Sequence, residues 1–277
     1  MNDDLYDPTW VEKYFDDFAE KEWDRLIISP AREVQLAIHN NLLNTHIRKG
    51  DKVLEVGAGP GRFTQSLANL RAKVTVTDIS SVQVALNKEN SEKYGFAGSV
   101  NEWHQLDMCD MSRFDDNSFD AVVAYGGPLS YVLDKRDIAI QECIRLAKPG
   151  GIILLSVMCL WGTIHQYLDG VLGFSPEDNL KIIESGDLTQ SNSKMATHYC
   201  HLFRSQELRT FLESHNLEVI DMAASNVLTP VHADRLIEAR NDEAKWKQVL
   251  DMELKACREP GNLDAGTHII AAVRKPR

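Results

Sequence analysis

The sequence predicts an α/β fold built around a parallel sheet, and two observations support this. From Lys52 onward, short β-branched runs alternate with helical patterns, as β-α-β units require. The first of these runs leads directly into a glycine-rich turn, Gly57-Ala-Gly-Pro-Gly61, and a helical pattern follows that turn. At 277 residues the chain is long enough for one large α/β domain with added segments.

The expected elements follow one another in a regular order. Strands are expected near 52–57, 73–78, 100–106, 119–125 and 151–158. Helices are expected between them at 61–70, 81–94 and 134–147. Pro149-Gly150-Gly151 should form the turn into the fifth strand. After residue 204 we expect a helix near 205–214, a strand near 217–224, a long helical stretch near 231–257 and a final strand near 267–274.

Two segments stand outside this alternation. Residues 1–48 carry apolar side chains at three-to-four-residue spacing, which predicts an N-terminal helical region. Residues 160–204 mix Gly, Asp, Ser, Asn, His and aromatic residues without a clean period. We therefore expect 160–204 to be a cap or substrate insertion within a domain that spans 49–277.

Charge and apolar patterning limit the partners and the compartment. The net charge of −11, without a dense Lys/Arg stripe, disfavours nucleic acid as a substrate. The longest apolar stretch, 152–161, is about half of the roughly 20 residues that a membrane span needs, so no membrane partner is expected. The acidic N-terminus does not resemble an export signal. The five cysteines form no C-x-x-C pair, which favours a reducing, cytoplasmic setting.

The spacing around the glycine turn narrows the kind of ligand. Glycine permits a sharp turn and a close approach of the backbone to a ligand. A dinucleotide-binding loop places its third glycine three residues after the second, where this chain has Arg62. The chain instead reads Glu55-x-Gly57-x-Gly59-x-Gly61. A purely structural turn and another nucleotide site remain the alternatives at this point.

This E-x-G-x-G-x-G segment resembles the first motif of the class I S-adenosylmethionine-dependent methyltransferases. Further segments resemble the family's later motifs in the expected order, over about residues 53–158: Val74-Thr-Val-Thr-Asp78, Gln105-Leu-Asp107-Met108, Phe119-Asp-Ala-Val-Val-Ala-Tyr125 and Leu146-Ala-Lys-Pro-Gly-Gly151. The resemblance implies a Rossmann-like, doubly wound sheet of seven strands with the last strand antiparallel. It also implies S-adenosylmethionine as the cofactor and a role for residues 1–48 as a lid.

The resemblance assigns roles to several positions. The glycine loop would wrap the amino-acid end of the cofactor, and Asp78 would accept hydrogen bonds from the ribose hydroxyls, although it can equally be a helix N-cap. Asp107 would bind the adenine amino group, and Met108 would pack on the ring. The expected cofactor-binding residues are Glu55, Gly57, Ala58, Gly59, Gly61, Asp78, Ile79, Asp107, Met108, Tyr125, Gly126, Tyr14 and Arg32.

Candidate catalytic residues come from two segments. Ligands of such sheets bind at the carboxyl ends of the strands, so Tyr125 and Tyr131, after the fourth strand, should lie beside the reactive sulfur or pack under the cap. His165, His198 and His201 are candidate bases for an acceptor that must lose a proton, with simple packing as the alternative. His198, Cys200 and His201 have no matching cluster elsewhere, so no metal site is expected.

The expected function is methyl transfer from S-adenosylmethionine to an oxygen or nitrogen of a small molecule. One alternative is a non-methyl reaction of the same cofactor, cyclisation or aminocarboxypropyl transfer, which releases methylthioadenosine. Others are a non-catalytic S-adenosylmethionine-binding protein and a nicotinamide-binding protein. No pattern in the sequence points to a particular acceptor or to an oligomeric state.

Overall fold

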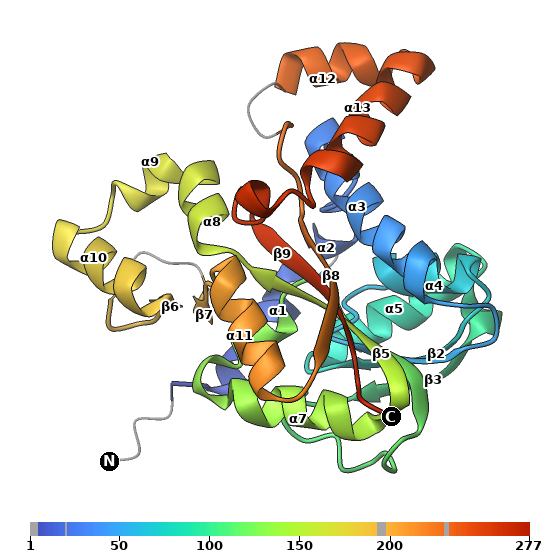
Figure 1. Cartoon of the computed structure of the whole chain (residues 1–277). Helices are drawn as coiled ribbons and strands as arrows, with labels where there is room; N and C mark the ends of the chain where they lie inside the picture. The colour runs from blue at the N-terminus through green and yellow to red at the C-terminus, as the bar shows by residue number, and fades with distance from the viewer. Residues whose placement is uncertain (1–4, 20, 193–197, 230–232) are drawn as a thin grey trace.

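A seven-stranded sheet forms the centre of the molecule in the computed structural model, which describes residues 5–19, 21–192, 198–229 and 233–277 (Figure 1). The strand order is β3-β2-β1-β4-β5-β9-β8. The strands are β1 (Lys52–Val56), β2 (Lys73–Asp78), β3 (Val100–Gln105), β4 (Phe119–Ala124), β5 (Ala147–Met158), β8 (Glu218–Ala224) and β9 (His268–Arg274).

Strand direction within the sheet confirms the predicted fold class. β1 pairs in parallel with β2 and β4, β2 with β3, and β4 with β5. β9, the last strand in the chain, pairs antiparallel with both β5 and β8. The carboxyl ends of β1 to β5 therefore meet at one edge of the sheet, where ligands of such sheets bind.

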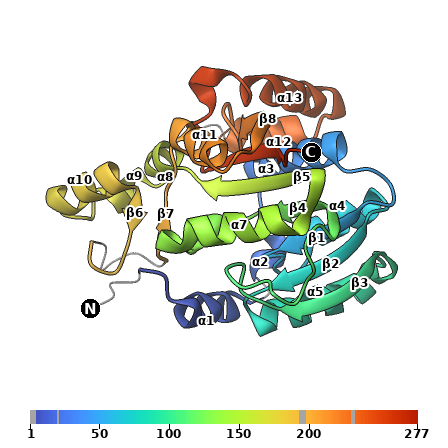
Figure 2. The same cartoon turned by 60° about the horizontal axis from the view of Figure 1, so that its bottom comes forward.

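Helices cover both faces of the sheet, as two views show (Figures 1 and 2). On one face lie α3 (Pro30–His46), α4 (Arg62–Asn69), α5 (Ser81–Lys93) and α13 (Glu243–Ala256). On the other lie α7 (Arg136–Leu146) and α11 (Ser205–Ser214). α12 (Ala233–Arg240) packs on α3 and α13. Because both faces are covered, the central strands β1, β4, β5 and β9 are buried and mainly apolar, whereas the edge strand β3 is partly exposed and polar.

Two elements differ from their predicted bounds. β5 begins at Ala147 and includes the segment predicted as a turn. Its pairing with β4 shifts register between Ala147 and Ile152, and Gly150 within this stretch has a φ of +76°. The stretch predicted near 231–257 is split into α12 and α13. The side chain of Asp242 accepts hydrogen bonds from the backbone N–H groups of Ala244 and Lys245, so it starts a new helix there.

The N-terminal region and the segment after β5 supply the remaining helices. The N-terminal helices before α3 are α1 (Pro8–Phe18) and α2 (Lys21–Asp24), and α6 (Pro128–Tyr131) follows β4. Residues 160–204, called the cap segment below, contain α8 (Leu160–Gln166), α9 (Leu168–Val171), α10 (Pro176–Ser185), β6 (Asp187–Leu188) and β7 (Cys200–His201). Three short 3-10 helices complete the fold at Ala97–Ser99, Leu133–Lys135 and Pro260–Asn262.

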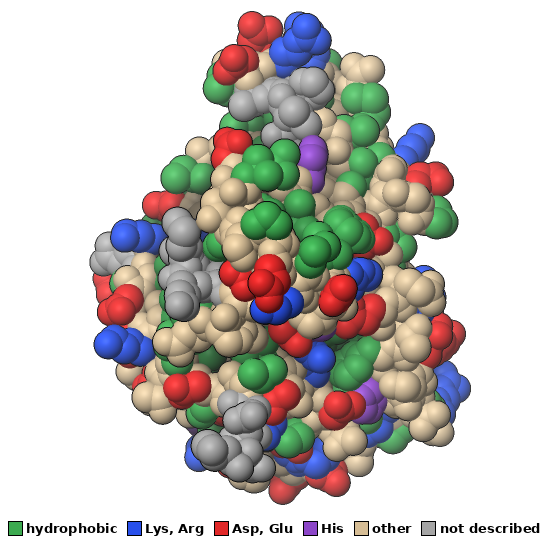
Figure 3. Space-filling view, turned by 90° about the vertical axis from the view of Figure 1, so that its left-hand side faces the viewer, with side chains coloured by type: hydrophobic (Ala, Val, Ile, Leu, Met, Phe, Trp, Pro, Cys, Tyr) green, Lys and Arg blue, Asp and Glu red, His purple; other side chains and the backbone are tan. Residues whose placement is uncertain are grey.

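The cap segment projects from one side of the sheet, on the face seen in Figure 3. Large apolar side chains of the segment are exposed, among them Trp161, Leu172 and Leu180. Lys and Arg side chains on this face lie dispersed among acidic ones (Figure 3). In the described ranges, no helix has the length and apolar character needed to cross a membrane.

Backbone contact between α8 and the loop before β9 joins the cap segment to the sheet. A Cβ on Gly162 would lie 1.8 Å from the carbonyl oxygen of Gly266, so only glycine fits there without movement. We expect Gly162→Ala to lower the free energy of unfolding by roughly 1–3 kcal/mol, the usual cost of overpacking. Urea unfolding measures this change.

Gly170→Ala in α9 is the matched control, because a Cβ there meets nothing within 4 Å. It should leave stability unchanged or raise it by up to about 1 kcal/mol. Equal effects of the two substitutions would contradict the packing account.

Candidate functional site

The glycine loop between β1 and α4 has a left-handed backbone at each of its glycines. Gly57, Gly59 and Gly61 have φ values of +63°, +55° and +103°, which L side chains rarely adopt. A Cβ on Gly57 would also lie 2.5 Å from Cγ of Pro128, and one on Gly61 would lie 3.1 Å from the Asn87 amide. The loop therefore needs glycine for its conformation and for the close approach of its neighbours.

Hydrogen bonds from β2 and α5 hold this loop in place. Asp78, the last residue of β2, accepts hydrogen bonds from the backbone N–H groups of Gly59 at 2.8 Å and Ser80 at 2.9 Å. Asn87 of α5 donates to the carbonyl oxygen of Gly59 at 3.1 Å and to the Thr64 hydroxyl at 2.9 Å. Burial raises the pKa of Asp78 to about 6, although both backbone bonds favour the charged carboxylate.

Glu55 lies beneath the loop and is not among the residues that line the adjacent cavity. Its carboxylate accepts a 2.7 Å hydrogen bond from the Thr64 hydroxyl at the start of α4. Burial raises its pKa to about 8. Glu55 thus contacts α4 and acts on the loop from below, which differs from the direct cofactor contact expected from the sequence.

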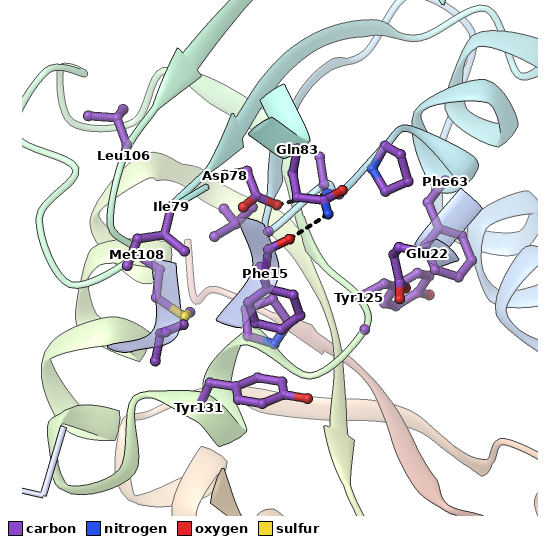
Figure 4. A pocket seen from close by; sticks show the side chains of 18 of the residues that line it. Phe15, Glu22, Phe63, Asp78, Ile79, Gln83, Leu106, Met108, Tyr125 and Tyr131 are labelled. Atoms are coloured by element: carbon purple, nitrogen blue, oxygen red, sulfur yellow. Dashed lines mark hydrogen bonds between the residues drawn. The ribbon is translucent and has the colours of Figure 1, made fainter. Parts of the chain in front are cut away.

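A cavity opens above the loop at the carboxyl ends of β1, β2, β3 and β4 (Figure 4). We call it the first cavity. Ten of the thirteen residues expected to bind the cofactor line this cavity or lie directly beside it. Those that line the cavity are Gly57, Ala58, Gly59, Asp78, Ile79, Asp107, Met108, Tyr125 and Gly126, while Gly61 caps α4 directly behind them.

The N-terminal region closes over the first cavity. The Tyr6 hydroxyl donates to the Asp107 carboxylate at 2.9 Å. The Gln83 amide donates to the carbonyl oxygen of Phe15 at 2.9 Å, as Figure 4 shows. The Ser80 hydroxyl donates to the Asp16 carboxylate at 2.5 Å. α1 is thereby held across the carboxyl ends of β2 and β3, which is the arrangement that a lid requires.

Two buried polar atoms in the lining have no hydrogen-bond partner among the described residues. They are the side-chain carbonyl oxygen of Gln83 and the hydroxyl of Tyr125. An unpaired buried polar group is costly, so such atoms indicate where a polar ligand fits. Tyr125 otherwise packs edge-on against His39 and Phe63. The donors and acceptors of this cavity fit a polar, nucleoside-containing cofactor.

A second, larger cavity adjoins the first. It has a volume of about 490 Å³ and lies between the N-terminal helices and the cap segment. The two cavities share Phe15, Glu22, Arg25, Gly126 and Tyr131 as lining residues, so they meet at the loop after β4. A ligand in the second cavity would therefore face a cofactor in the first.

Tyr14 and Arg32 line the second cavity and not the first. Their assignment to the cofactor does not fit this geometry, because α1 and α3 direct these side chains toward the cap segment. The Arg32 guanidinium donates to the Tyr167 hydroxyl of the cap segment at 3.2 Å. Both side chains are therefore placed to contact a ligand of the second cavity.

The three candidate histidine bases lie in different surroundings. His198 lines the second cavity, with its ring centroid 6.0 Å from that of Tyr131. His165 is exposed and lines neither cavity. His201 also lines neither, and its two ring nitrogens lie 2.6 Å from the carboxylates of Asp187 and Glu207.

His201 is a structural link and does not fit the role of a base. Burial lowers its pKa, but the hydrogen bonds with Asp187 and Glu207 outweigh burial and raise the pKa above its ordinary value. Because both nitrogens are occupied, no nitrogen is left to accept a proton from a ligand. The three side chains instead join β7, β6 and α11.

The sequence reasoning missed His268, the first residue of β9. This side chain lines the second cavity, and a Cβ on Gly127 would lie 4.0 Å from its Nε2 atom. Burial, together with nearby Arg25, holds its pKa well below the ordinary value, so the ring is neutral at pH 7. Nothing in the sequence around it marks it, because only the antiparallel insertion of β9 beside β5 brings it to the site.

The fold and the loop together define an α/β domain with a cavity at the carboxyl ends of its parallel strands. Comparison with known proteins then shows which family part of the chain resembles. Residues 53–151 match the family model described as "Methyltransferase domain". Over these residues the chain resembles the class I S-adenosylmethionine-dependent methyltransferases.

A curated relative resembles a similar length of the chain. The ubiquinone/menaquinone biosynthesis C-methyltransferase UbiE of Pasteurella multocida (strain Pm70) is 34% identical over 112 residues. The alignment covers 39% of this chain and 40% of that enzyme, so the chain matches less than half of the relative's length.

Solved structures share the fold over most of the chain. The Burkholderia thailandensis 1,6-didemethyltoxoflavin-N1-methyltransferase, with its substrate and S-adenosylhomocysteine bound, is 13% identical with a TM-score of 0.58, covering 100% of this chain and 94% of that one. The [4+2]-cyclase SpnF is 20% identical with a TM-score of 0.53, covering 89% and 80%. Likeness at this identity shows the fold alone.

Titration of Glu55 should make the stability of the protein depend on pH. The ordinary glutamate pKa is 4.5, and burial raises that of Glu55 to about 8. Between these values the folded protein keeps a proton that the unfolded chain releases, so stability falls as pH rises, by at most about 1.4 kcal/mol per pH unit. Glu55→Gln should remove the share of this fall that Glu55 causes, while Asp78, whose pKa burial raises to about 6, keeps its own smaller share; urea unfolding at about pH 5 and about pH 8 measures the difference.

Glu89→Gln is the matched control, since Glu89 is exposed on α5. It should keep the pH dependence of the wild type. If Glu55→Gln and wild type lose the same stability between the two pH values, Glu55 is not the group responsible.

Proposed function

We propose that this protein transfers the methyl group of S-adenosylmethionine to a small molecule held in the second cavity. One observation carries the proposal: the two cavities meet at Gly126 and Tyr131, the residues that follow β4. Methyl transfer needs a donor and an acceptor in line with each other and shielded from water. Adjoining cavities under one set of covering helices suit this requirement.

The residues around the first cavity suit the adenosine part of the cofactor. Asp78 lies at the end of β2, where a carboxylate can accept hydrogen bonds from ribose hydroxyls. Asp107 and Met108 follow β3 and suit the adenine amino group and ring. The Gln83 carbonyl oxygen offers a further buried acceptor.

Glu22 and Arg25 suit the zwitterionic amino-acid end of the cofactor. Their side chains are paired at 2.5 Å, and both line the first cavity. A Cβ on Gly59 would lie 3.6 Å from Cγ of Glu22, and one on Gly126 would lie 4.0 Å from the Arg25 guanidinium. The pair thus spans from the glycine loop to the loop after β4. We assign Glu22 to the ammonium group and Arg25 to the carboxylate.

The chemistry places simple demands on the protein. When bound, the cofactor supplies an electrophilic methyl carbon, and displacement by the acceptor leaves the electron pair of the broken C–S bond on sulfur. An acceptor hydroxyl or amine must also lose a proton. His268 can take it at Nε2, which makes no hydrogen bond to any described residue, and His198 is a second neutral imidazole in the same cavity.

Both covering segments have a role in this proposal. Residues 1–48 act as the lid over the cofactor, and residues 160–204 enclose the acceptor. Tyr131 lines both cavities and Tyr125 lines the first, so Tyr131 can help to position both ligands and Tyr125 the cofactor. Cytoplasmic location and a small-molecule partner remain part of the same proposal.

The direct test is to identify the product formed from S-adenosylmethionine. Purified protein incubated with labelled S-adenosylmethionine and a metabolite pool should release S-adenosylhomocysteine in an amount that depends on the pool, as measured by liquid chromatography and mass spectrometry. Release of methylthioadenosine would overturn methyl transfer in favour of attack at another carbon. Tight binding without either product would favour a non-catalytic role.

Substitution of Arg25 tests the assignment of the amino-acid end. Arg25→Gln should weaken S-adenosylhomocysteine binding about tenfold or more, because a charged hydrogen bond is lost. It should leave methylthioadenosine binding almost unchanged, since that ligand has no carboxylate. Calorimetry with both ligands measures the difference.

Arg48→Gln controls for the loss of a positive charge, since Arg48 is exposed and lines neither cavity. It should affect neither ligand. An equal loss of both ligands in Arg25→Gln would show that the substitution damages the pocket as a whole and would remove the assignment.

A further inference from the structure

We propose that the acceptor is a largely apolar molecule that carries one anionic group, and that Arg32 binds this group in the second cavity. The inference rests on the proposed function, because it names the acceptor class of the same site. Three features of the cavity carry it: its apolar wall, its charge balance and the surroundings of the Arg32 guanidinium.

The wall of the second cavity is mainly aromatic and aliphatic. Side chains from α1, α6, β5 and the cap segment contribute to it: Tyr14, Phe15, Phe18, Tyr131, Met158, Ile164, Val171, Phe174, Ile182, Leu188 and Leu202. A volume of about 490 Å³ lies within the usual range for sites that bury most of a small organic ligand. Such a wall favours an apolar ligand body over a sugar or a polar amino acid.

The charged side chains of the lining do not balance. Among the residues that the structure describes, the Asp, Glu, Lys and Arg side chains that line the cavity are Glu22, Arg25 and Arg32, and Glu22 and Arg25 neutralise each other at 2.5 Å. Burial lowers the pKa of His198 and of His268, so both are neutral at pH 7. One positive charge remains, on Arg32, in a protein whose net charge is −11.

The hydrogen-bond partners of Arg32 leave this charge uncompensated. Its guanidinium donates to the side-chain oxygen of Gln35 at 2.9 Å and to the Tyr167 hydroxyl at 3.2 Å, and both partners are neutral. Within the described ranges no carboxylate lies at ion-pair distance from it. A guanidinium has five donors, and a carboxylate or similar oxyanion can accept two of them at once. An anionic ligand group therefore supplies the partner that the protein does not.

The position of Arg32 also orients the acceptor. Arg25 lines both cavities, whereas Arg32 lines only the second. An anionic group held at Arg32 leaves the rest of the molecule free to reach His268 and the junction at Gly126. The acceptor would then be fixed at its charged end and react at another position.

Two dyes with the same aromatic framework test this inference. 8-Anilinonaphthalene-1-sulfonate carries a sulfonate, and N-phenyl-1-naphthylamine is the same framework without it. Each is titrated by fluorescence into full-length protein saturated with S-adenosylhomocysteine, which blocks the first cavity. The variants are Arg32→Gln, Arg32→Lys and the control Arg48→Gln.

We expect the wild type to bind the sulfonate more tightly than the neutral dye. Arg32→Gln should weaken sulfonate binding about tenfold or more while changing the neutral dye less than twofold. Arg32→Lys should keep most of the sulfonate affinity, and Arg48→Gln should match the wild type. Equal losses of both dyes, no change in either, or no sulfonate binding to wild type would each overturn the proposal.

Failure of this inference and failure of the proposed function give different results. Calorimetry with S-adenosylhomocysteine is run on the same four proteins. If all bind it but Arg32→Gln does not discriminate between the dyes, only the acceptor class is wrong. If wild type does not bind S-adenosylhomocysteine, the proposed function itself fails.

Discussion

The arrangement of the site depends on one constraint, the hydrogen bond that Asp78 accepts from the backbone N–H of Gly59. This contact joins the carboxyl ends of β1 and β2 and holds a loop whose glycines all have left-handed backbone. Asn87 fixes the same glycine through its carbonyl oxygen. Loop, strand end and α5 therefore form one rigid unit, and the first cavity is the space that this unit leaves at the edge of the sheet.

Covering segments turn that open edge into an enclosed site. Hydrogen bonds to Ser80 and Gln83 hold α1, and a hydrogen bond to Asp107 holds Tyr6 just before it. The cap segment is tied to the rest of the domain through His201 and through the backbone contact at Gly162. In the proposed function the sheet positions the cofactor, and two segments outside the matched residues 53–151 shape the acceptor end.

Sequence reasoning succeeded where function and backbone geometry impose a local pattern. The strands, the glycine loop and the acids after β2 and β3 were predictable, because each depends on residues close together in the chain. It was less successful with side chains that act from a distance. Glu55 supports the loop from below, Tyr14 and Arg32 face the second cavity, and His201 is enclosed by two carboxylates. The residues that surround each of these side chains lie far from it in the sequence, so local patterns do not predict them.

By itself, the sequence determined the fold class and a family resemblance, because the spacing of apolar residues indicates which faces are buried and the spacing of the glycines indicates a backbone that approaches a ligand closely. Only the tertiary structure decided which side chains share a cavity. His268 arrives from the last strand, Arg32 from α3 and Tyr131 from the loop after β4, and their meeting depends on strand order and helix packing. The residues of a site assembled from distant segments have no regular spacing in the sequence. Such a site can therefore be recognised only in the folded structure.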